Sequence, residues 1–303
     1  MKRLNNILIT GGLGYIGSKL IRDLSKSYNL VVIDNFYTQR YCSLFNVEHN
    51  VKFLECSFVD IPLEIIKQSD VIIHLAAVTN AADSFNNKDI ELINIKQTKQ
   101  FIDICKKESE AKFIFPSSTS VYGVASDIVL EDDDRFLNPQ SPYAESKIEI
   151  ENYIKSKNMS YIILRLGTIF GYSPGIRFHT AINKFCYQAA LGIPLTIWKQ
   201  NYNQYSPYLG LNDCVKSITF FLENDISKQT YNVITDNFKL SDIITQIKNM
   251  IEVDLDLINT PLLNQQSYKV NIKKILKLGF LPKDNLYKEI KSIIGMLKCI
   301  KGY

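Results

Sequence analysis

The sequence lacks the residue patterns that mark several large protein classes. Its six cysteines form no C-x-x-C pair, and with three histidines in the whole chain no zinc-ligand spacing exists. No apolar stretch reaches the ~18 residues that a membrane-spanning helix requires. The net charge is only +4, from 35 basic and 31 acidic side chains, and no segment is a Lys/Arg-rich block. We therefore expect no bound metal, no membrane span and no nucleic-acid partner.

The start of the chain also falls short of a targeting signal. Two basic residues precede the apolar run ILI, residues 7–9, and this run stops at the pair Gly11 and Gly12. That is too short for the apolar core of a secretory signal peptide. Cysteines scattered singly through a long chain are typical of reduced thiols. Both observations predict a cytoplasmic protein.

The hydrophobic residues are arranged as short runs separated by amphipathic segments. With 46% hydrophobic and 22% charged residues, the chain has the composition of a globular protein with a sizeable core. Strands are predicted at 7–10, 30–34, 51–56, 70–77 and 112–118, with helices near 61–67 and 89–107. Runs of Val, Ile and Leu without alternation favour strands buried on both faces. The predicted fold class is therefore α/β, a Rossmann-type doubly wound parallel sheet.

The pattern continues into the second half but becomes looser. A helix to about residue 157 leads into a strand at 161–166. Beyond Gly171 we expect strands at 195–198 and 230–234, and helices at 178–192, 212–224, 240–251, 271–277 and 284–298. This half is predicted to form a smaller lobe over the carboxyl edge of the sheet, where α/β proteins bind ligands.

A glycine-rich loop follows the first strand. Gly11, Gly14 and Gly17 form a G-x-x-G-x-x-G pattern that opens a helix. Such glycines let the backbone approach a pyrophosphate at a helix N-terminus, although a glycine trio alone is also typical of a tight strand-to-helix turn. Asp34 ends the second strand, 20 positions after Gly14, and Asn35 follows it. An acidic residue there binds the ribose 2′-hydroxyl of NAD and repels the 2′-phosphate of NADP, so NAD is the predicted cofactor.

A second cluster of polar residues points to proton transfer. In the stretch SPYAESK, Tyr143 precedes Lys147 by four residues at the start of a helix, so both side chains share one face. An ammonium one turn away is expected to lower the pKa of the phenol toward the operating pH. This spacing alone also occurs by chance on solvated helices. The hydroxyl of Ser118, at the end of a predicted strand, favours catalysis because it can hydrogen-bond a substrate oxygen.

Together these motifs resemble an extended short-chain dehydrogenase/reductase, in the NAD-dependent epimerase/dehydratase family that acts on nucleotide sugars. The resemblance runs nearly end to end and rests on GGLGYIG (11–17), HLAA (74–77), PSSTSVYG (116–123), YAESK (143–147) and RLGTIFG (165–171). It implies an NAD-binding Rossmann domain at 1–171 that carries the catalytic residues. Residues 172–303 are then mainly a substrate-binding lobe, with some segments returning to the sheet.

The resemblance also assigns roles to individual residues. The catalytic set is Ser118, Tyr143 and Lys147. The cofactor-binding set is Gly11, Gly14, Tyr15, Ile16, Gly17, Asp34, Asn35, Ser57, Phe58, Leu75, Ala76, Ala77 and Asn94, together with Tyr143 and Lys147. The substrate-binding set is Thr119, Thr168, Arg177 and Asn183.

Several positions depart from the family pattern. Thr119 and Ser120 stand where 4,6-dehydratases of the family carry an acidic pair, so we predict that this chain is not a 4,6-dehydratase. Ser57 stands where an Asp usually meets the adenine, and Thr168 where many epimerases have a substrate-binding Asn. Ser206 replaces an Arg that often clamps the substrate diphosphate.

The segment SPGIR, residues 173–177, does not decide which nucleotide sugar is the substrate. Arg177 in this segment is either a replacement clamp for the diphosphate or a surface arginine on a loop. A similar SPxxR stretch occurs in the family subgroup that includes GDP-heptose C4-dehydrogenases. The predicted substrate is therefore a UDP- or GDP-linked sugar.

The resemblance implies hydride transfer at a sugar carbon, at C4, through a transient keto sugar. Return of the hydride to the other face makes an epimerase, and release of the keto sugar makes a dehydrogenase, in sugar-nucleotide or surface-polysaccharide biosynthesis. Two alternatives stay open: an NADPH-dependent keto-sugar reductase and a non-catalytic NAD-binding protein on the same fold. The family also implies a homodimer formed by the helix near 94–107 and the helix that carries Tyr143.

Overall fold

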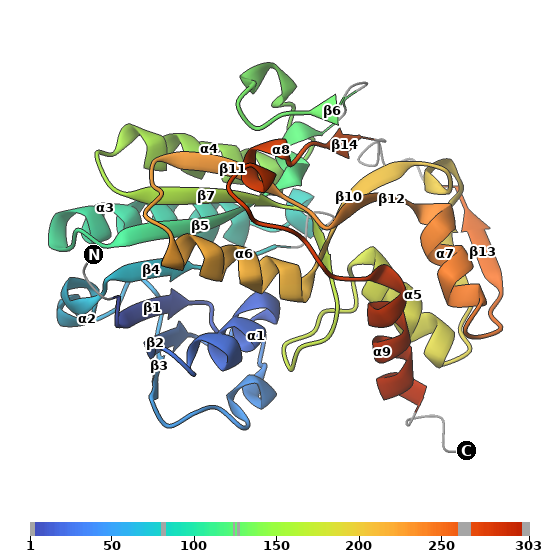
Figure 1. Cartoon of the computed structure of the whole chain (residues 1–303), viewed down its shortest axis with the longest axis horizontal. Coiled ribbons are helices and arrows are strands. Elements are labelled where there is room, and N and C mark those ends of the chain that lie inside the picture. The colour runs from blue at the N-terminus through green and yellow to red at the C-terminus, as the bar shows by residue number, and fades with distance from the viewer. Residues whose placement is uncertain (1–3, 80–82, 124, 126–127, 260–267, 299–303) are drawn as a thin grey trace.

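A seven-stranded parallel sheet forms the centre of the molecule (Figure 1). The computed structural model describes residues 4–79, 83–123, 125, 128–259 and 268–298. In sheet order the strands are β11 (Gln229–Val233), β7 (Tyr161–Leu166), β5 (Lys112–Ser118), β4 (Val71–His74), β1 (Asn6–Thr10), β2 (Asn29–Asp34) and β3 (Val51–Glu55). The order reverses between β1 and β4, as in a doubly wound sheet. The predicted fold class is confirmed.

Both faces of the sheet are covered because its strands are apolar on both sides. One core packs Ile7 and Ile9 against α1 (Tyr15–Leu24) and α6 (Leu211–Glu223). The other packs Leu8 against α3 (Thr98–Glu108) and α4 (Pro142–Ser156), with α2 (Leu63–Gln68) at its edge. Figure 1 shows α3 and α4 on one side of the sheet and α1 and α6 on the other. This burial on both faces is the reason that the strands read as unbroken apolar runs.

The second half of the chain builds a smaller lobe, seen on the right of Figure 1. Its helices are α5 (Ala181–Ala190), α7 (Leu240–Lys248) and α9 (Leu286–Lys298), which share a separate core. Its strands are β8 (Thr168–Phe170), β9 (Leu195–Trp198), β10 (Tyr205–Gly210), β12 (Asp236–Lys239) and β13 (Leu255–Ile258). The short pair β6 (Ile128–Val129) and β14 (Lys269–Val270), with the helix α8 (Lys273–Leu276), lies beyond β11.

The two halves of the chain are interwoven. After the lobe begins, α6 returns to the core beneath the sheet, and β11 extends the sheet by pairing in parallel with β7. No helix in the described part of the chain is long and apolar enough to cross a membrane. A domain boundary at residue 171 stays a prediction, and the return of these two segments is consistent with the expectation that parts of residues 172–303 rejoin the sheet.

A buried carboxylate fastens the C-terminal segment to α6. Asp213, which is fully buried, accepts hydrogen bonds from the backbone amides of Lys283 (2.8 Å) and Asp284 (2.9 Å) and from the hydroxyl of Thr235 (2.7 Å). Asp284 returns a bond by accepting from the amide of Asp213 at 2.9 Å. The reciprocal pair therefore joins the start of α6 to the segment that leads into α9.

Replacement of Asp213 by Ala is expected to destabilise the fold by roughly 3 kcal/mol, because two buried amides and a hydroxyl lose their acceptor. Urea unfolding followed by circular dichroism measures this change. Asp256→Ala, on the exposed part of β13, is the matched control and should change the free energy of unfolding by less than about 0.5 kcal/mol. Equal effects of the two variants would contradict the proposed fastening.

Candidate active site

The glycine loop after β1 is shaped for close backbone approach. Gly11 has a φ of +66°, and a Cβ added there would lie 2.5 Å from the backbone nitrogen of Ala76. At Gly17 an added Cβ would lie 2.4 Å from the oxygen of Gly12. At Gly14 the nearest atom, the oxygen of Gly11, is 3.2 Å away. The loop is thus closed on its inner side, and the first-turn amides of α1 have no acceptor within the helix. This cradle fits a pyrophosphate.

Asp34 ties the end of β2 to this loop. Its carboxylate accepts a hydrogen bond from the amide of Leu13 at 3.0 Å and another from the amide of Phe36 at 2.9 Å. Burial raises the pKa of Asp34, and these two amides act against the rise. Asn35, the next residue, is exposed. The carboxylate therefore stands beside the glycine loop, at the position where the sequence predicted a ribose contact.

The loop after β3 carries two predicted cofactor-binding residues, Ser57 and Phe58, which lie in different environments. Ser57 is half-buried, and its hydroxyl accepts from the amide of Val59 at 3.5 Å. Phe58 is buried, with its ring 4.9 Å from that of His74 and 5.6 Å from that of Phe101. The Phe58 ring belongs to the core, so a cofactor contact by this residue would have to come from its backbone and stays a prediction.

The end of β4 lies against the glycine loop. The amide of Leu75 donates to the oxygen of Thr10 at 3.0 Å, and the Thr10 hydroxyl lies 2.7 Å from Nδ1 of His74. Burial, with a smaller contribution from Lys147, lowers the pKa of His74 to about 3, so its side chain is a neutral core group. Leu75, Ala76 and Ala77 are half-buried and continue along the edge of the sheet.

Asn94 holds the segment after β4 in place. Its side-chain oxygen accepts from the amide of Val78 at 2.8 Å, and its side-chain nitrogen donates to the Val78 oxygen at 2.8 Å. The residue lies in η3 (Ile90–Gln97), a π-helical stretch that precedes α3. The sequence predicted a plain helix here, and the wider turns of this stretch are of a kind often found at functional sites. Asn94 thus fixes the backbone at Val78, in the segment that follows β4.

The smaller lobe is locked onto the glycine loop. The Tyr15 hydroxyl donates to the oxygen of Gly171 at 2.5 Å and accepts from the Asn183 amide at 2.9 Å. The hydroxyls of Ser18 and Ser173 lie 3.0 Å apart. Tyr15 and Asn183 are both buried, so the Tyr15 phenol points into the lobe and away from the loop surface. Ile16, which directly follows Tyr15, is half-buried.

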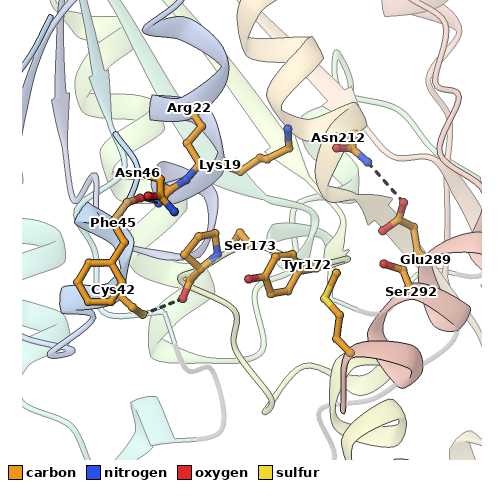
Figure 2. A pocket seen from close by; sticks show the side chains of 12 residues that line it. Lys19, Arg22, Cys42, Phe45, Asn46, Tyr172, Ser173, Asn212, Glu289 and Ser292 are labelled. Carbon is orange, nitrogen blue, oxygen red and sulfur yellow. Dashed lines mark hydrogen bonds between the residues drawn. The ribbon is translucent and has the colours of Figure 1, made fainter. Parts of the chain in front are cut away.

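A groove of about 650 Å³ lies on the outer side of this lock, as Figure 2 shows. Lys19 and Arg22 of α1 line one side, and Glu289 of α9 lines another. The Cys42 thiol donates to the oxygen of Pro174 at 3.2 Å along its floor. The groove contains none of the predicted catalytic or cofactor-binding residues. The groove therefore lies outside the predicted active site.

The catalytic residues of the prediction are brought together at the carboxyl end of β5. Ser118 ends this strand, while Tyr143 and Lys147 occupy the first two turns of α4. The helix starts there because the Ser141 hydroxyl accepts from the amide of Ala144 at 3.2 Å and Pro142 fills the first turn. The Lys147 ammonium is buried, donates to the oxygen of Pro116 at 2.8 Å and lies 5.7 Å from the centre of the Tyr143 ring.

The electrostatics of this group differ from the expectation. Burial raises the pKa of Tyr143, and the nearby Arg177 and a hydrogen bond with Ser118 act against that rise. The predicted net lowering of the Tyr143 pKa is therefore not present, because loss of water around the phenol outweighs the effects of Arg177 and Ser118. Burial also lowers the pKa of Lys147 to about 8, opposed by attraction to Glu151.

Arg177 is half-buried on the segment before α5 and interacts electrostatically with Tyr143. Its guanidinium donates to the hydroxyl of Thr79 and, at 2.9 Å, to Nε2 of His179. Burial lowers its pKa to about 10, and attraction to Tyr143 acts to raise it. The backbone oxygen of Arg177 accepts from Asn183 at 3.0 Å. Asn183 therefore holds the arginine segment from the interior, and direct contact of Asn183 with a substrate stays a prediction that this geometry does not favour.

The other predicted substrate residues occupy the wall between the sheet and the lobe. Thr119 follows Ser118 and is buried, with its hydroxyl accepting from the Tyr268 hydroxyl at 3.2 Å. Thr168 opens β8 and is half-buried. Ser120 has a buried hydroxyl with no hydrogen-bond partner in the described part of the chain. Tyr268 and Thr79 were missed from sequence because each reaches the site only through tertiary contact.

Comparison with known proteins identifies the family of this chain. The model of the NAD dependent epimerase/dehydratase family matches residues 7–233. A Bacillus subtilis (strain 168) protein named "Uncharacterized UDP-glucose epimerase YtcB" is 31% identical over 234 residues, which are 71% of this chain and 72% of that protein. A Dictyostelium discoideum dTDP-D-glucose 4,6-dehydratase is 31% identical over 271 residues, 79% of this chain and 60% of that enzyme.

A solved structure shows the same architecture. UDP-glucuronic acid 4-epimerase from Bacillus cereus, in complex with UDP-glucuronic acid and NAD, superposes with a TM-score of 0.87 at 26% identity, over 97% of this chain and 99% of that one. The present chain thus belongs to the NAD dependent epimerase/dehydratase family. The predicted family and the predicted NAD cofactor are confirmed.

Replacement of Gly11 by Ala is expected to abolish tight NAD binding and to destabilise the fold by at least ~1–2 kcal/mol. The positive φ alone costs that amount, and the new Cβ collides with the Ala76 backbone. Isothermal titration with NAD and thermal unfolding measure the two effects. Gly295→Ala is the matched control, because nothing lies within 4 Å of a Cβ built there. Normal NAD affinity in Gly11→Ala would show that the loop does not hold the cofactor.

Proposed function

We propose that this protein is an NAD-dependent nucleotide-sugar epimerase that inverts C4 of a sugar through a transient keto sugar. The observation that carries the proposal is the joint placement of Ser118, Tyr143 and Lys147 at the sheet edge that also holds the glycine loop. The similarity to a UDP-glucuronic acid 4-epimerase over nearly the whole of both chains supports it.

The chain's own residues handle the proton. Tyr143 is positioned to take the proton of a sugar hydroxyl, and the Ser118 hydroxyl is positioned to hydrogen-bond the same oxygen. Arg177 is a cation near the phenol and favours its phenolate form, and the Lys147 ammonium lies 5.7 Å from the centre of the ring. NAD, when bound, supplies the hydride acceptor and later the hydride donor. The lock between the glycine loop and the lobe favours retention of the cofactor through both steps, which suits an epimerase better than a dehydrogenase.

The acid and base of a 4,6-dehydratase are not supplied at the expected positions. Elimination of water needs two such groups near C5 and C6, and the residues after Ser118 are the hydroxyl side chains Thr119 and Ser120. Thr119 is moreover engaged by Tyr268. We therefore exclude dehydration from the proposed activity, although a 4,6-dehydratase is among the relatives.

The alternatives from other classes are disfavoured by particular residues. Asp34 stands where an NADPH-dependent reductase would have to accept a 2′-phosphate, and its charge repels that group. A protein that only senses NAD would not need the assembled Ser118, Tyr143 and Lys147. Relatives that bind UDP-sugars favour UDP over GDP as the nucleotide of the substrate.

We also propose that the protein is a cytoplasmic homodimer. The homodimer would form through α3 and α4, as the family implies. Two ion pairs link the exposed surfaces of these helices within one chain, Lys99 with Glu149 at 2.5 Å and Lys157 with Asp103 at 2.6 Å. The proposed location is the cytoplasm, where nucleotide sugars and NAD would be the natural substrate and cofactor.

The purified protein should release NAD or NADH on denaturation and should convert one member of a panel of UDP- and GDP-sugars to its C4 epimer. Nuclear magnetic resonance identifies the epimer, and chromatography identifies the released nucleotide. Release of NADPH would refute the cofactor assignment. Accumulation of a free keto sugar together with NADH would assign the dehydrogenase outcome instead.

Replacement of Tyr143 by Phe is expected to lower kcat by about 10²- to 10⁴-fold while NAD remains bound, because the proton acceptor is lost and the ring packing is kept. Steady-state turnover on the active sugar measures kcat. Tyr153→Phe, at a half-buried position of the same helix, is the control and should retain full activity. Full turnover by Tyr143→Phe would refute the mechanism.

A further inference from the structure

A hydrogen bond joins the segments that follow the two strands on either side of β1. The Tyr37 hydroxyl donates to Oδ2 of Asp89 at 2.8 Å, although the two residues are 52 positions apart in the chain. Tyr37 lies in the loop after β2, and Asp89 directly precedes η3. Neither residue belongs to the predicted catalytic, cofactor-binding or substrate-binding sets. We call this contact the Tyr37–Asp89 bridge.

The loop after β2 is anchored by Phe36. Its backbone has a φ of +53°, which is unfavourable for a bulky side chain. Its ring is stacked on that of Tyr41, with centroids 4.2 Å apart, and meets the ring of Phe53 edge-on at 5.5 Å. Tyr37 is 55% exposed, and its amide donates to Oδ1 of Asn35 at 3.1 Å. The loop is therefore rooted in the core at Phe36, while the next side chain reaches outward.

The other end of the bridge is attached to the segment after β4. The amide of Asp89 donates to Oδ1 of Asn87 at 2.9 Å, and η3 begins at the next residue. Within η3, Asn94 binds both backbone groups of Val78 at 2.8 Å. Asp89 is thus connected through one short helical stretch to the segment that carries the predicted cofactor-binding residues 75–77.

The strand order places the bridge at the cofactor site. β1 lies between β2 and β4 and pairs in parallel with both strands. All three strands therefore end at one edge of the sheet, where the glycine loop follows β1 and Asp34 ends β2. An acidic residue in the position of Asp34 binds the adenosine ribose, and the glycine loop holds the pyrophosphate. A bond between the segments after β2 and β4 consequently spans the edge where the adenosine half of NAD would lie.

We propose that Tyr37 and Asp89 are positioning residues for the cofactor: their hydrogen bond holds the loop after β2 over the adenosine half of bound NAD and slows the release of NAD. An exposed hydrogen bond contributes little to the stability of the whole fold. A bond that must break before the cofactor leaves instead adds to the barrier for release. Because the acceptor is a carboxylate, this bond is stronger than one between two neutral groups.

The state of the donor is consistent with this role. The hydrogen bond with Asp89 raises the pKa of Tyr37, with further contributions from burial and from the Asp89 charge. The phenol therefore keeps the proton that it donates throughout the neutral pH range. Slow release also suits the proposed function, in which one NAD molecule accepts a hydride and returns it to the same sugar.

The test is the rate at which the purified protein releases NAD in the absence of any sugar. Protein loaded with NAD that carries tritium in its adenine is mixed with excess unlabelled NAD, and the label retained on a filter is followed with time. Tyr37→Phe and Asp89→Ala are each expected to raise the release rate by about 5- to 20-fold, because each removes the charge-assisted bond. Tyr287→Phe, which removes the hydroxyl of an exposed tyrosine on α9, is the matched control and should release NAD like the parent protein.

The double variant tests whether the two side chains act through their shared bond. It should release NAD no faster than the faster single variant, because both substitutions remove the same interaction. Accelerations that multiply in the double variant would overturn the proposal, since they would show two independent effects. An unchanged release rate in both single variants would overturn it as well.

Thermal unfolding of the cofactor-free variants separates this role from a purely structural one. Both single variants should unfold at the same temperature as the parent protein, because the bond lies at the surface. A lowered unfolding temperature in both variants, together with faster release, would assign the bridge to the stability of the fold and would also overturn the proposal. Because the assay contains no sugar, its failure is distinguishable from failure of the proposed epimerase function.

Discussion

The parallel pairing of β1, β4 and β5 is the constraint on which the rest of the site depends. Because the three strands run in one direction, their carboxyl ends reach the same edge of the sheet. That edge therefore gathers Gly11, the residues 75–77 and Ser118, which are far apart in sequence. The close packing of the Gly11 backbone on Ala76 leaves no space for a side chain at that point. A glycine there is a consequence of the strand pairing.

Burial of charge is the second determinant of the site. Lys147 and the Glu151–Arg165 pair lie out of water between α4 and the sheet, where each charge is stabilised only by a specific partner. Burial moves the pKa of Lys147 down and that of Tyr143 up, both against the catalytic form. The neighbouring groups oppose these shifts, so small changes in the partners are expected to have large effects on proton transfer.

The interweaving of the two halves explains how the lobe is held over the sheet. β11 and α6 anchor it to the main core, and the bonds of Tyr15 and Ser18 anchor it to the glycine loop. The segment with Arg177 is thereby held above Tyr143. A cover of this kind would shield the proposed catalytic group from water.

Much of this architecture could be read from local patterns. Short segments dominated by apolar residues placed β7 and β9 at their observed bounds. The sequence also showed the glycine spacing, Asp34 and the Tyr143–Lys147 pair, because each of these motifs depends on neighbours within one loop or one helical turn. Only tertiary structure showed that Arg177 lies at Tyr143, that Tyr15 and Asn183 point into the lobe, and that Glu151 meets Arg165. These facts depend on contacts between distant segments, and on how much water such contacts remove from each charge, which no local pattern encodes.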